Sequence, residues 1–557
     1  MNSSRRALLL IWICFVVRGL FYSAMFPIWE GYDEPFHLAY IQELIHNRAV
    51  PGPATPISRE VQQSLHVLPL PWTISQDQLP PPILVHDDYW KLEPAERRRL
   101  EEEFRAMPLG WQQEDANESI GNYEAQQTPL YYLLFYFPVQ WMSGFSLAIR
   151  VFFLRILNIL LASLVVPLGY LVARGVLKSS GLALAAVALI AVLPELFVDL
   201  ARVGNEGLAL VLYTLALYFA VKAVEGSENF KNFLWLGITL ALGLLTKAYF
   251  LTALPALFVL AAACFWRWPG HRKSLVTNAL LAGAAIAVIA GPWYWRVHKL
   301  TGSWSGISYD AALHSMSRWH MLAEVRHVNW AGGMISILLS HVWFGGWSFL
   351  KFPRVVYLFF GAIILASVAG MCRVLLVKVR GKNEEAESGD WRRADSGGLG
   401  AVTAFYAFFW LGLIYDLLIT YVATGYSAST GWYMYALIVA EIILFYFGLS
   451  AVMPRSFRSW ILPALTALFA LLDLSGMHFY MIPYYCGVIF HTTPDRVAAA
   501  SLPKLVQVGI PEFGRRLSIN KPDFLGPAEF GVLWIAYLAA TALLVYMTFR
   551  LRNIDEN

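Results

Sequence analysis

Cysteine and charge are both scarce in this sequence. The 557 residues include four cysteines and no C-x-x-C pair, so neither a zinc motif nor a disulfide framework is indicated. Asp, Glu, Lys and Arg make up 14% of the chain, whereas a soluble domain carries roughly 25%. The net charge of +4 is small, which argues against a nucleic-acid-binding protein.

Several nucleotide-binding and hydrolytic motifs are also absent. No P-loop, G-x-G-x-x-G, G-x-S-x-G or H-E-x-x-H pattern occurs, which argues against an ATP-driven pump, a Rossmann-domain nucleotide-sugar enzyme, a serine hydrolase and a zincin. A sugar transferase working outside the cytoplasm would then need a donor activated without a soluble nucleotide, such as a polyprenyl-phosphate sugar.

Hydrophobic residues, by contrast, form 58% of the chain and gather in runs long enough to cross a bilayer. We therefore predict an all-α polytopic membrane protein of about twelve transmembrane helices, the first of them an uncleaved N-terminal span. The predicted spans are 7–27, 156–172, 182–197, 207–221, 233–245, 250–266, 275–293, 355–377, 401–422, 432–451, 461–474 and 530–549.

The distribution of Lys and Arg predicts the orientation of these spans, because short cytoplasmic loops are enriched in both residues. Arg5 and Arg6 precede the first span, and Arg550 and Arg552 follow the last, so we expect both termini in the cytoplasm of a bacterial plasma membrane. An apolar run at 129–144 is too short and aromatic for a span, and we expect an interfacial helix there. The charged, Gly/Ser-rich stretch 381–400 is expected to be a flexible cytoplasmic linker.

Three long segments then fall on the outer face, at 28–150, 294–354 and 475–529. Long connections of this kind usually carry function. The first contains the sequence Asp33-Glu34-Pro35-Phe36-His37, in which His37 can face both acids because it follows them by four and three residues. Such a cluster suits a general base or a metal site.

Asp33 has a plainer interpretation as a helix cap. Acidic residues followed by proline are typical of a helix N-terminus, and residues 35–47 are predicted to form an amphipathic helix on the membrane surface. The sequence leaves both roles open.

Further polar groups fall on the same outer face. Glu195, Asp199, Arg202, Asn205 and Glu206 crowd a short turn between two spans. Elsewhere on this face, Glu124 precedes the pair Tyr131-Tyr132, and Lys247 separates two apolar stretches. An ammonium group at that depth can hold a lipid phosphate, although simple snorkelling to the interface explains Lys247 as well.

Four other features are weaker indications of function. Arg18, Asp416 and Glu441 lie within predicted spans, where ionisable residues are generally functional candidates. The tripeptide 117–119 fits an N-glycosylation acceptor.

The order and membrane placement of these motifs resemble the GT-C superfamily of membrane glycosyltransferases, which includes protein O-mannosyltransferases and lipid A aminoarabinose transferases. The resemblance is closest to a bacterial branch with an acidic D-E-P-x-H-like motif after the first span. It rests on the motif at 31–37, the segment 124–132, Leu157-Asn158, Gly204-Asn205-Glu206 and Leu245-Thr246-Lys247. It is good over residues 1–295, the expected catalytic module, and loose over 296–557, the expected variable module.

The resemblance implies sugar transfer from a polyprenyl-phosphate donor to a glycan, lipid or protein acceptor outside the cytoplasm, with inversion at the sugar carbon. Asp33 would be the catalytic base, with Glu34 beside it. Substrate contacts would come from His37, Glu124, Arg202, Asn205, Glu206 and Lys247. A divalent metal is compatible with the acidic cluster, but the sequence does not require any cofactor.

Two other functions remain open on the sequence alone. A transporter or flippase of lipid-linked glycans would need charged groups along a path through the spans, and often inverted repeats. In a non-catalytic assembly protein, Asp33 and Glu34 would only cap a helix.

Overall fold

The computed structural model describes residues 3–52, 55–74, 79, 83–110, 120–313, 316–379, 395–493 and 496–552. The glycosylation tripeptide 117–119 and residues 381–394 of the expected linker lie outside these ranges. The end of that expected linker is helical, because a helix begins at Ser396.

The elements that the structure describes in the first half of the chain are all helices, and several short ones lie within its long first connection. The elements are α1 (Ser3–Met25), α2 (Glu34–Asn47), α3 (Arg59–Val67), α5 (His86–Tyr89), α6 (Pro94–Arg105), η1 (Tyr123–Gln126), α7 (Leu130–Trp141), α8 (Leu147–Ala162), α9 (Val165–Leu177), α10 (Ser180–Ile190), α11 (Pro194–Leu200), α12 (Glu206–Val224), η2 (Ser227–Lys231), α13 (Asn232–Leu244), η3 (Ala248–Thr252), α14 (Ala253–Arg267), η4 (Pro269–His271) and α15 (Arg272–Ile289).

The second half adds five long apolar helices and one small hairpin. The elements are α16 (Gly291–Thr301), α17 (Ser308–Ala312), α18 (Arg318–Glu324), α19 (Trp330–Val342), α20 (Arg354–Val379), α22 (Ser396–Thr424), η6 (Gly431–Leu437), α23 (Ile438–Val452), α24 (Arg455–Arg458), α25 (Ile461–Gly476), η7 (Met477–Met481), α26 (Ile482–Tyr485), β1 (His491–Thr493), β2 (Arg496–Val497), α27 (Leu502–Val508), α28 (Ile510–Leu517) and α29 (Pro527–Leu551).

The all-α polytopic fold predicted from the sequence is confirmed. Among the described residues, ten helices are long and apolar enough to cross a membrane, or eleven if α10 and α11, bent by 61°, form one span. The remaining predicted span corresponds to α13, whose 13 residues are fewer than a span usually needs.

Packing nevertheless shows that α13 carries the chain back across the helical layer. Lys247, just after α13, forms an ion pair with Glu206 at the start of α12, so the two helices run antiparallel over the same depth. Helices α1 and α29 are also antiparallel, because Phe21 packs on Phe530 while Arg18 bonds Thr541. Both termini therefore lie on one side of the layer, which requires an even number of passes.

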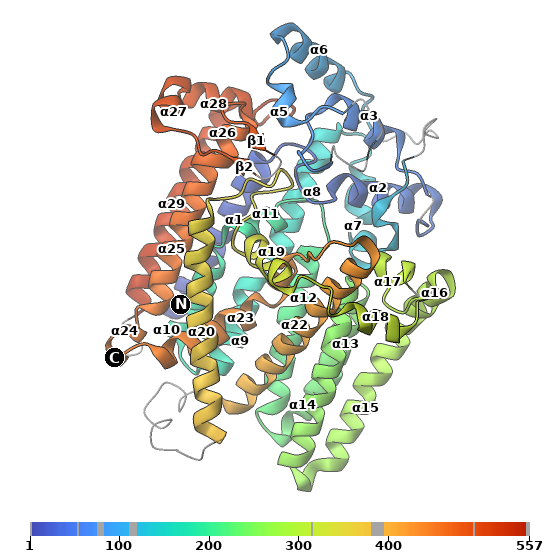
Figure 1. The fold of residues 1–557 in the computed structure, drawn as a ribbon, viewed down its shortest axis with the longest axis vertical. Coiled ribbons are helices and arrows are strands. Elements are labelled where there is room, and N and C mark those ends of the chain that lie inside the picture. Colours follow the sequence, from blue (N-terminus) through green and yellow to red (C-terminus); the bar gives the residue numbers. More distant parts are fainter. Residues whose placement is uncertain are drawn as a thin grey trace.

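We call the opposite side of the layer the loop side, because it carries the connections 26–146, 290–353 and 477–526. Figure 1 shows α2, α3, α5 and α6 gathered with α26, α27 and α28 at this end of the long helices. The predicted surface helix 35–47 does form, as α2, but residues 34–42 are buried by protein. The expectation that it rests on the membrane surface was therefore wrong.

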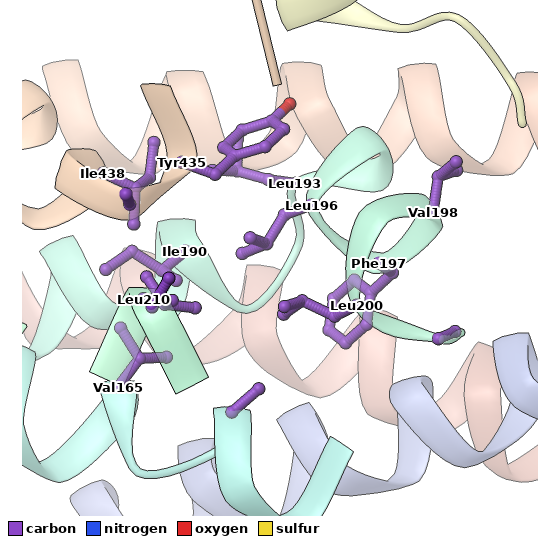
Figure 2. Packing of buried hydrophobic residues seen from close by; sticks show 14 of the residues in the cluster. Val165, Ile190, Leu193, Leu196, Phe197, Val198, Leu200, Leu210, Tyr435 and Ile438 are labelled. Atoms are coloured by element: carbon purple, nitrogen blue, oxygen red, sulfur yellow. The ribbon is translucent and has the colours of Figure 1, made fainter. Parts of the chain in front are cut away.

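Buried apolar side chains surround the bend between α10 and α11. Figure 2 shows Ile190 of α10 and Leu196 of α11 among neighbours from three other helices, Val165, Leu210 and Ile438. All five are buried, with at most 2% of each side chain exposed. Close packing of this kind fixes the bend between α10 and α11, and with it the polar turn that follows α11.

Arg18 lies at the centre of a buried polar cluster that joins α1 to α25 and α29. Its guanidinium lies 2.8 Å from the Asp473 carboxylate, and neither side chain is exposed. Tyr22 and Tyr537 also donate hydrogen bonds to Asp473, and Arg18 donates another to Thr541. The first span is thereby anchored to the last two.

The other two charges that the sequence places in spans also have partners. Glu441 lies 2.6 Å from Nε2 of His341, and Asp416 accepts a hydrogen bond from Ser429 at 2.7 Å.

We expect Asp473→Asn to destabilise the purified protein by about 3 kcal/mol, because it leaves the Arg18 charge buried without a counter-charge. The measurement is the thermal unfolding midpoint in detergent. Arg5→Gln is the control. It removes an exposed arginine from α1, the helix that carries Arg18, and should leave the midpoint unchanged. Equal midpoints for both variants would contradict an anchoring role.

Candidate active site

The motif predicted to carry the chemistry occupies a tight turn between α1 and α2. Asp33 adopts a left-handed conformation with φ of 56° and ψ of 12°, and its carbonyl accepts hydrogen bonds from the amides of Phe36 and His37. Its carboxylate makes no capping hydrogen bond to α2. The capping interpretation of the Asp33 side chain is therefore wrong, and the backbone alone starts the helix.

Glu34 is committed to a structural ion pair. Arg155 of α8 lies 2.7 Å and 2.5 Å from its two carboxylate oxygens, which also accept hydrogen bonds from the amides of Trp29 and Val203. The same guanidinium donates to the carbonyl of Pro27 at 2.8 Å. Glu34 thus holds the turn in place, and it has no open position from which to assist Asp33 directly.

Arg202 connects this turn to the polar cluster after α11. Its guanidinium lies 2.9 Å from the Asp199 carboxylate and 2.7 Å from that of Glu206, and it donates a hydrogen bond to the carbonyl of Tyr32. A Cβ on Gly31 would lie 2.4 Å from that of Arg202, so the turn approaches the arginine as only glycine permits.

Lys247 meets the same cluster from the end of α13. Its ammonium pairs with the second carboxylate oxygen of Glu206 and lies 5.3 Å from the ring centre of Tyr433. Asn205 joins this group by donating to the carbonyl of Thr246 at 3.2 Å, while its own Oδ1 is buried without a hydrogen-bond partner. An ammonium has three N–H donors, so Lys247 keeps donors for a ligand.

Glu124 and His37 form the opposite wall of the site. Oε2 of Glu124 lies 3.9 Å from Nδ1 of His37, and that nitrogen is 2.8 Å from the Tyr132 hydroxyl. Glu124 is 3% exposed and its Oε2 has no hydrogen-bond partner. Burial, reinforced by the charge of Asp33, raises the pKa of Glu124 to about 8, so this carboxyl is protonated at neutral pH.

Asp33 faces this cluster with a partly exposed side chain. No other described residue forms a hydrogen bond or ion pair with its carboxylate. Burial raises the pKa of Asp33 to about 6, with Arg202 and Lys247 opposing the shift and Glu206 adding to it. At neutral pH, Asp33 is therefore mostly ionised and able to accept a proton, whereas Glu124 carries one.

The structure brings all eight sequence-predicted site residues to the loop side, where seven of them join one electrostatic cluster and Glu34 anchors it. The sequence reasoning missed Arg155, whose signal was an arginine within the apolar run of α8. Among the described residues, no group of three or more His, Cys, Asp or Glu side chains is arranged to hold a metal ion.

A family described as dolichyl-phosphate-mannose-protein mannosyltransferase matches residues 137–295. This match confirms the resemblance to the GT-C membrane glycosyltransferases over that segment. The matched segment contains Arg202, Asn205, Glu206 and Lys247, and it begins after Asp33, Glu34, His37 and Glu124. No curated protein sequence matches the chain.

Solved structures resemble the chain only distantly. ArnT from Cupriavidus metallidurans, bound to undecaprenyl phosphate, matches with 10% identity and a TM-score of 0.42, covering 98% of this chain and 78% of its own. The Archaeoglobus fulgidus oligosaccharyltransferase in its apo form matches with 13% identity and a TM-score of 0.43, covering 98% and 56%. At these scores the likeness supports no inference about individual residues.

We expect Glu34→Gln and Asp33→Asn to differ in their effect on stability. Glu34→Gln leaves the buried Arg155 without its counter-charge, so the free energy of unfolding should fall by about 3 kcal/mol or more. Asp33→Asn breaks no hydrogen bond or ion pair of the described residues and should change it by less than about 0.5 kcal/mol. Thermal unfolding of the two purified variants, measured side by side, checks this; a larger loss for Asp33→Asn would restore the capping role.

Proposed function

We propose that this protein is a GT-C-type glycosyltransferase that moves a sugar from a polyprenyl-phosphate donor to an acceptor hydroxyl, with Asp33 as the general base. The observation that carries the proposal concerns the Asp33 carboxylate. It makes no capping hydrogen bond to α2 and faces a buried cluster that contains both Lys247 and Glu124. The resemblance over residues 137–295 supports the reaction class.

The proposed reaction forms one bond and breaks one bond at the sugar carbon. Asp33 takes the proton of the acceptor hydroxyl as its oxygen attacks, and the bond between the sugar carbon and the phosphate oxygen breaks with inversion. The carrier leaves as polyprenyl phosphate. A positioned base of this kind contributes typically 10²–10⁴-fold to the rate.

The roles of the remaining residues follow from their contacts. Lys247 has donors to spare and would contact the phosphate. Arg202 uses most of its donors on Asp199, Glu206 and Tyr32 and would position these residues around the site. Asn205 and the protonated Glu124 would offer an acceptor and a donor to the sugar or acceptor hydroxyls. Glu34 would position the turn.

The site would face the extracytoplasmic side of the membrane. The opposite side carries both termini and a series of basic residues that the positive-inside rule assigns to the cytoplasm. They are Arg174, Lys178, Lys222, Arg267, Arg272, Lys273, Arg455, Arg458 and Arg550. The transporter alternative is less well supported, since Arg18, Asp416 and Glu441 are each engaged by a neighbouring side chain.

Asp33→Asn should lower the rate of sugar transfer from a polyprenyl-phosphate donor by about 10²-fold or more, because an amide cannot accept the proton. The measurement is transfer of radiolabelled sugar in membranes that contain equal amounts of folded protein. Glu43→Gln, which removes a partly buried carboxylate from α2 outside the cluster, is the control and should retain activity. Undiminished transfer by Asp33→Asn would remove Asp33 from this role.

The activity should depend on pH as a bell. Transfer should rise as Asp33 ionises through its pKa of about 6 and fall as Glu124 loses its proton through its pKa of about 8. Glu124→Gln, which cannot ionise, should abolish the alkaline fall and leave the acid limb in place. A rate profile measured from acid to alkaline pH on both proteins checks this, and an unchanged alkaline limb in the variant would contradict the assignment.

A further inference from the structure

A pocket with both polar and apolar lining residues opens on the loop side. It holds about 440 Å³ of empty space, including its open mouth, between the end of α1, α5 and the loop joining α28 to α29. Arg516 and Lys521 line it together with His86, and none of its lining residues is acidic. Two acids contact these lining residues without lining the pocket themselves, namely Glu30 beside His86 and Glu512 beside Arg516.

Lys521 has no acidic partner among the described residues. Its side-chain nitrogen donates a hydrogen bond to the carbonyl of Phe26 and forms no described ion pair. Arg155 disfavours the charged form of Lys521, and Glu34, which is already bound to Arg155, favours it. Burial lowers the pKa of Lys521 well below its usual range. An incoming anion would favour the charged ammonium by supplying the missing counter-charge.

Polar atoms without hydrogen-bond partners line the same pocket. Oδ1 of Asn520 is buried without a partner, on a residue held in the left-handed conformation with φ of 57°. Nε2 of His86 and the hydroxyl of Tyr485 are buried as well, but both lie beside the buried Glu30 carboxylate, whose Oε2 is 3.2 Å from the His86 nitrogen. A buried polar atom without a partner, such as the Asn520 oxygen, generally awaits a ligand or water.

Arg516 is the other basic residue with a long side chain in the pocket lining. Its guanidinium is oriented by Glu512 at 2.6 Å and by the carbonyl of Cys486 at 2.6 Å, and it stacks over Trp90. Glu512 does not line the pocket. A fixed arginine and an unpaired lysine around one space match the several acceptor oxygens of a phosphate group.

We propose that this pocket is a phosphate-binding site, distinct from the Asp33 site, whose ligand is held by Lys521 and Arg516. Asn520 Oδ1 would accept the hydrogen of a singly protonated phosphate. The phosphate can belong to a lipid headgroup, because Met25 and Leu517 give one edge of the pocket an apolar lining, or it can be free in solution. The inference does not rest on the proposed transferase activity.

The test is isothermal titration of the purified full-length protein in detergent with two probes. One is inorganic phosphate, and the other is a short-chain phosphatidic acid kept below its micelle-forming concentration. Short-chain phosphatidylcholine serves as the control for apolar binding. Tighter binding of phosphatidic acid identifies a lipid headgroup, and equal or exclusive binding of inorganic phosphate identifies the free anion; both outcomes support the site.

Two variants locate the binding, and one matched control accompanies them. Lys521→Gln should weaken phosphate binding about tenfold or more, since it removes a charge-assisted hydrogen bond. Asn520→Asp should weaken it similarly by placing a carboxylate in the pocket, and it breaks no described hydrogen bond of Oδ1. Lys504→Gln removes an exposed lysine that also donates to a backbone carbonyl, that of Val488, and it should bind as the wild type does.

The proposal fails if neither probe binds the wild-type protein, or if Asn520→Asp and Lys504→Gln both bind as the wild type does. Asp33→Asn should bind phosphate normally at this pocket even when it has lost sugar transfer. Loss of transfer and loss of phosphate binding therefore report separately on the two sites.

Discussion

The ion pair between Glu34 and Arg155 is the interaction on which the loop-side architecture depends. It joins the turn after α1 to α8 in a place where both side chains are almost completely buried. One partner alone would leave an uncompensated charge, which costs several kcal/mol. Because Glu34 is held so firmly, the residue before it can remain in a left-handed conformation, with its carboxylate turned toward Lys247 and Glu206 instead of toward the helix.

Charge balance explains why Asp33 is mostly ionised at neutral pH while Glu124 is protonated. The cluster contains the cations Arg202 and Lys247, which are shared among Asp199, Glu206 and Asp33. Glu124 forms no described ion pair with either cation, and its burial is compensated by protonation. One carboxylate kept charged beside one kept neutral is the arrangement that proton transfer at neutral pH requires.

The sequence predicted the fold and the membership of the cluster better than it predicted the contacts within it. Apolar runs and basic loops were enough to place the helices, because each span needs a length and a composition of its own. The partnership of Glu34 with Arg155, 121 residues later, has no local signature. The same holds for Arg18 and Asp473, since Asp473 lies near the end of a run and does not look buried in the sequence. Because Glu34 is next to Asp33 in the sequence, it was predicted to share the catalytic role. In the folded chain its ion pair with Arg155 gives it a structural role instead.

The Asp33 site and the pocket that contains Lys521 both involve the segment that follows α1, which the sequence does not reveal. Met25, Pro27 and Ile28 line the pocket that contains Lys521, and Asp33 and Glu34 follow a few residues later in the same segment. Arg155 bridges the two by binding Glu34 while repelling Lys521, and its other N–H groups hold the carbonyls of Phe26 and Pro27 between them. A change in charge at Lys521 therefore acts on both members of the ion pair between Arg155 and Glu34. Because this ion pair holds the turn, the two sites can be linked electrostatically without any movement of the helices that carry them.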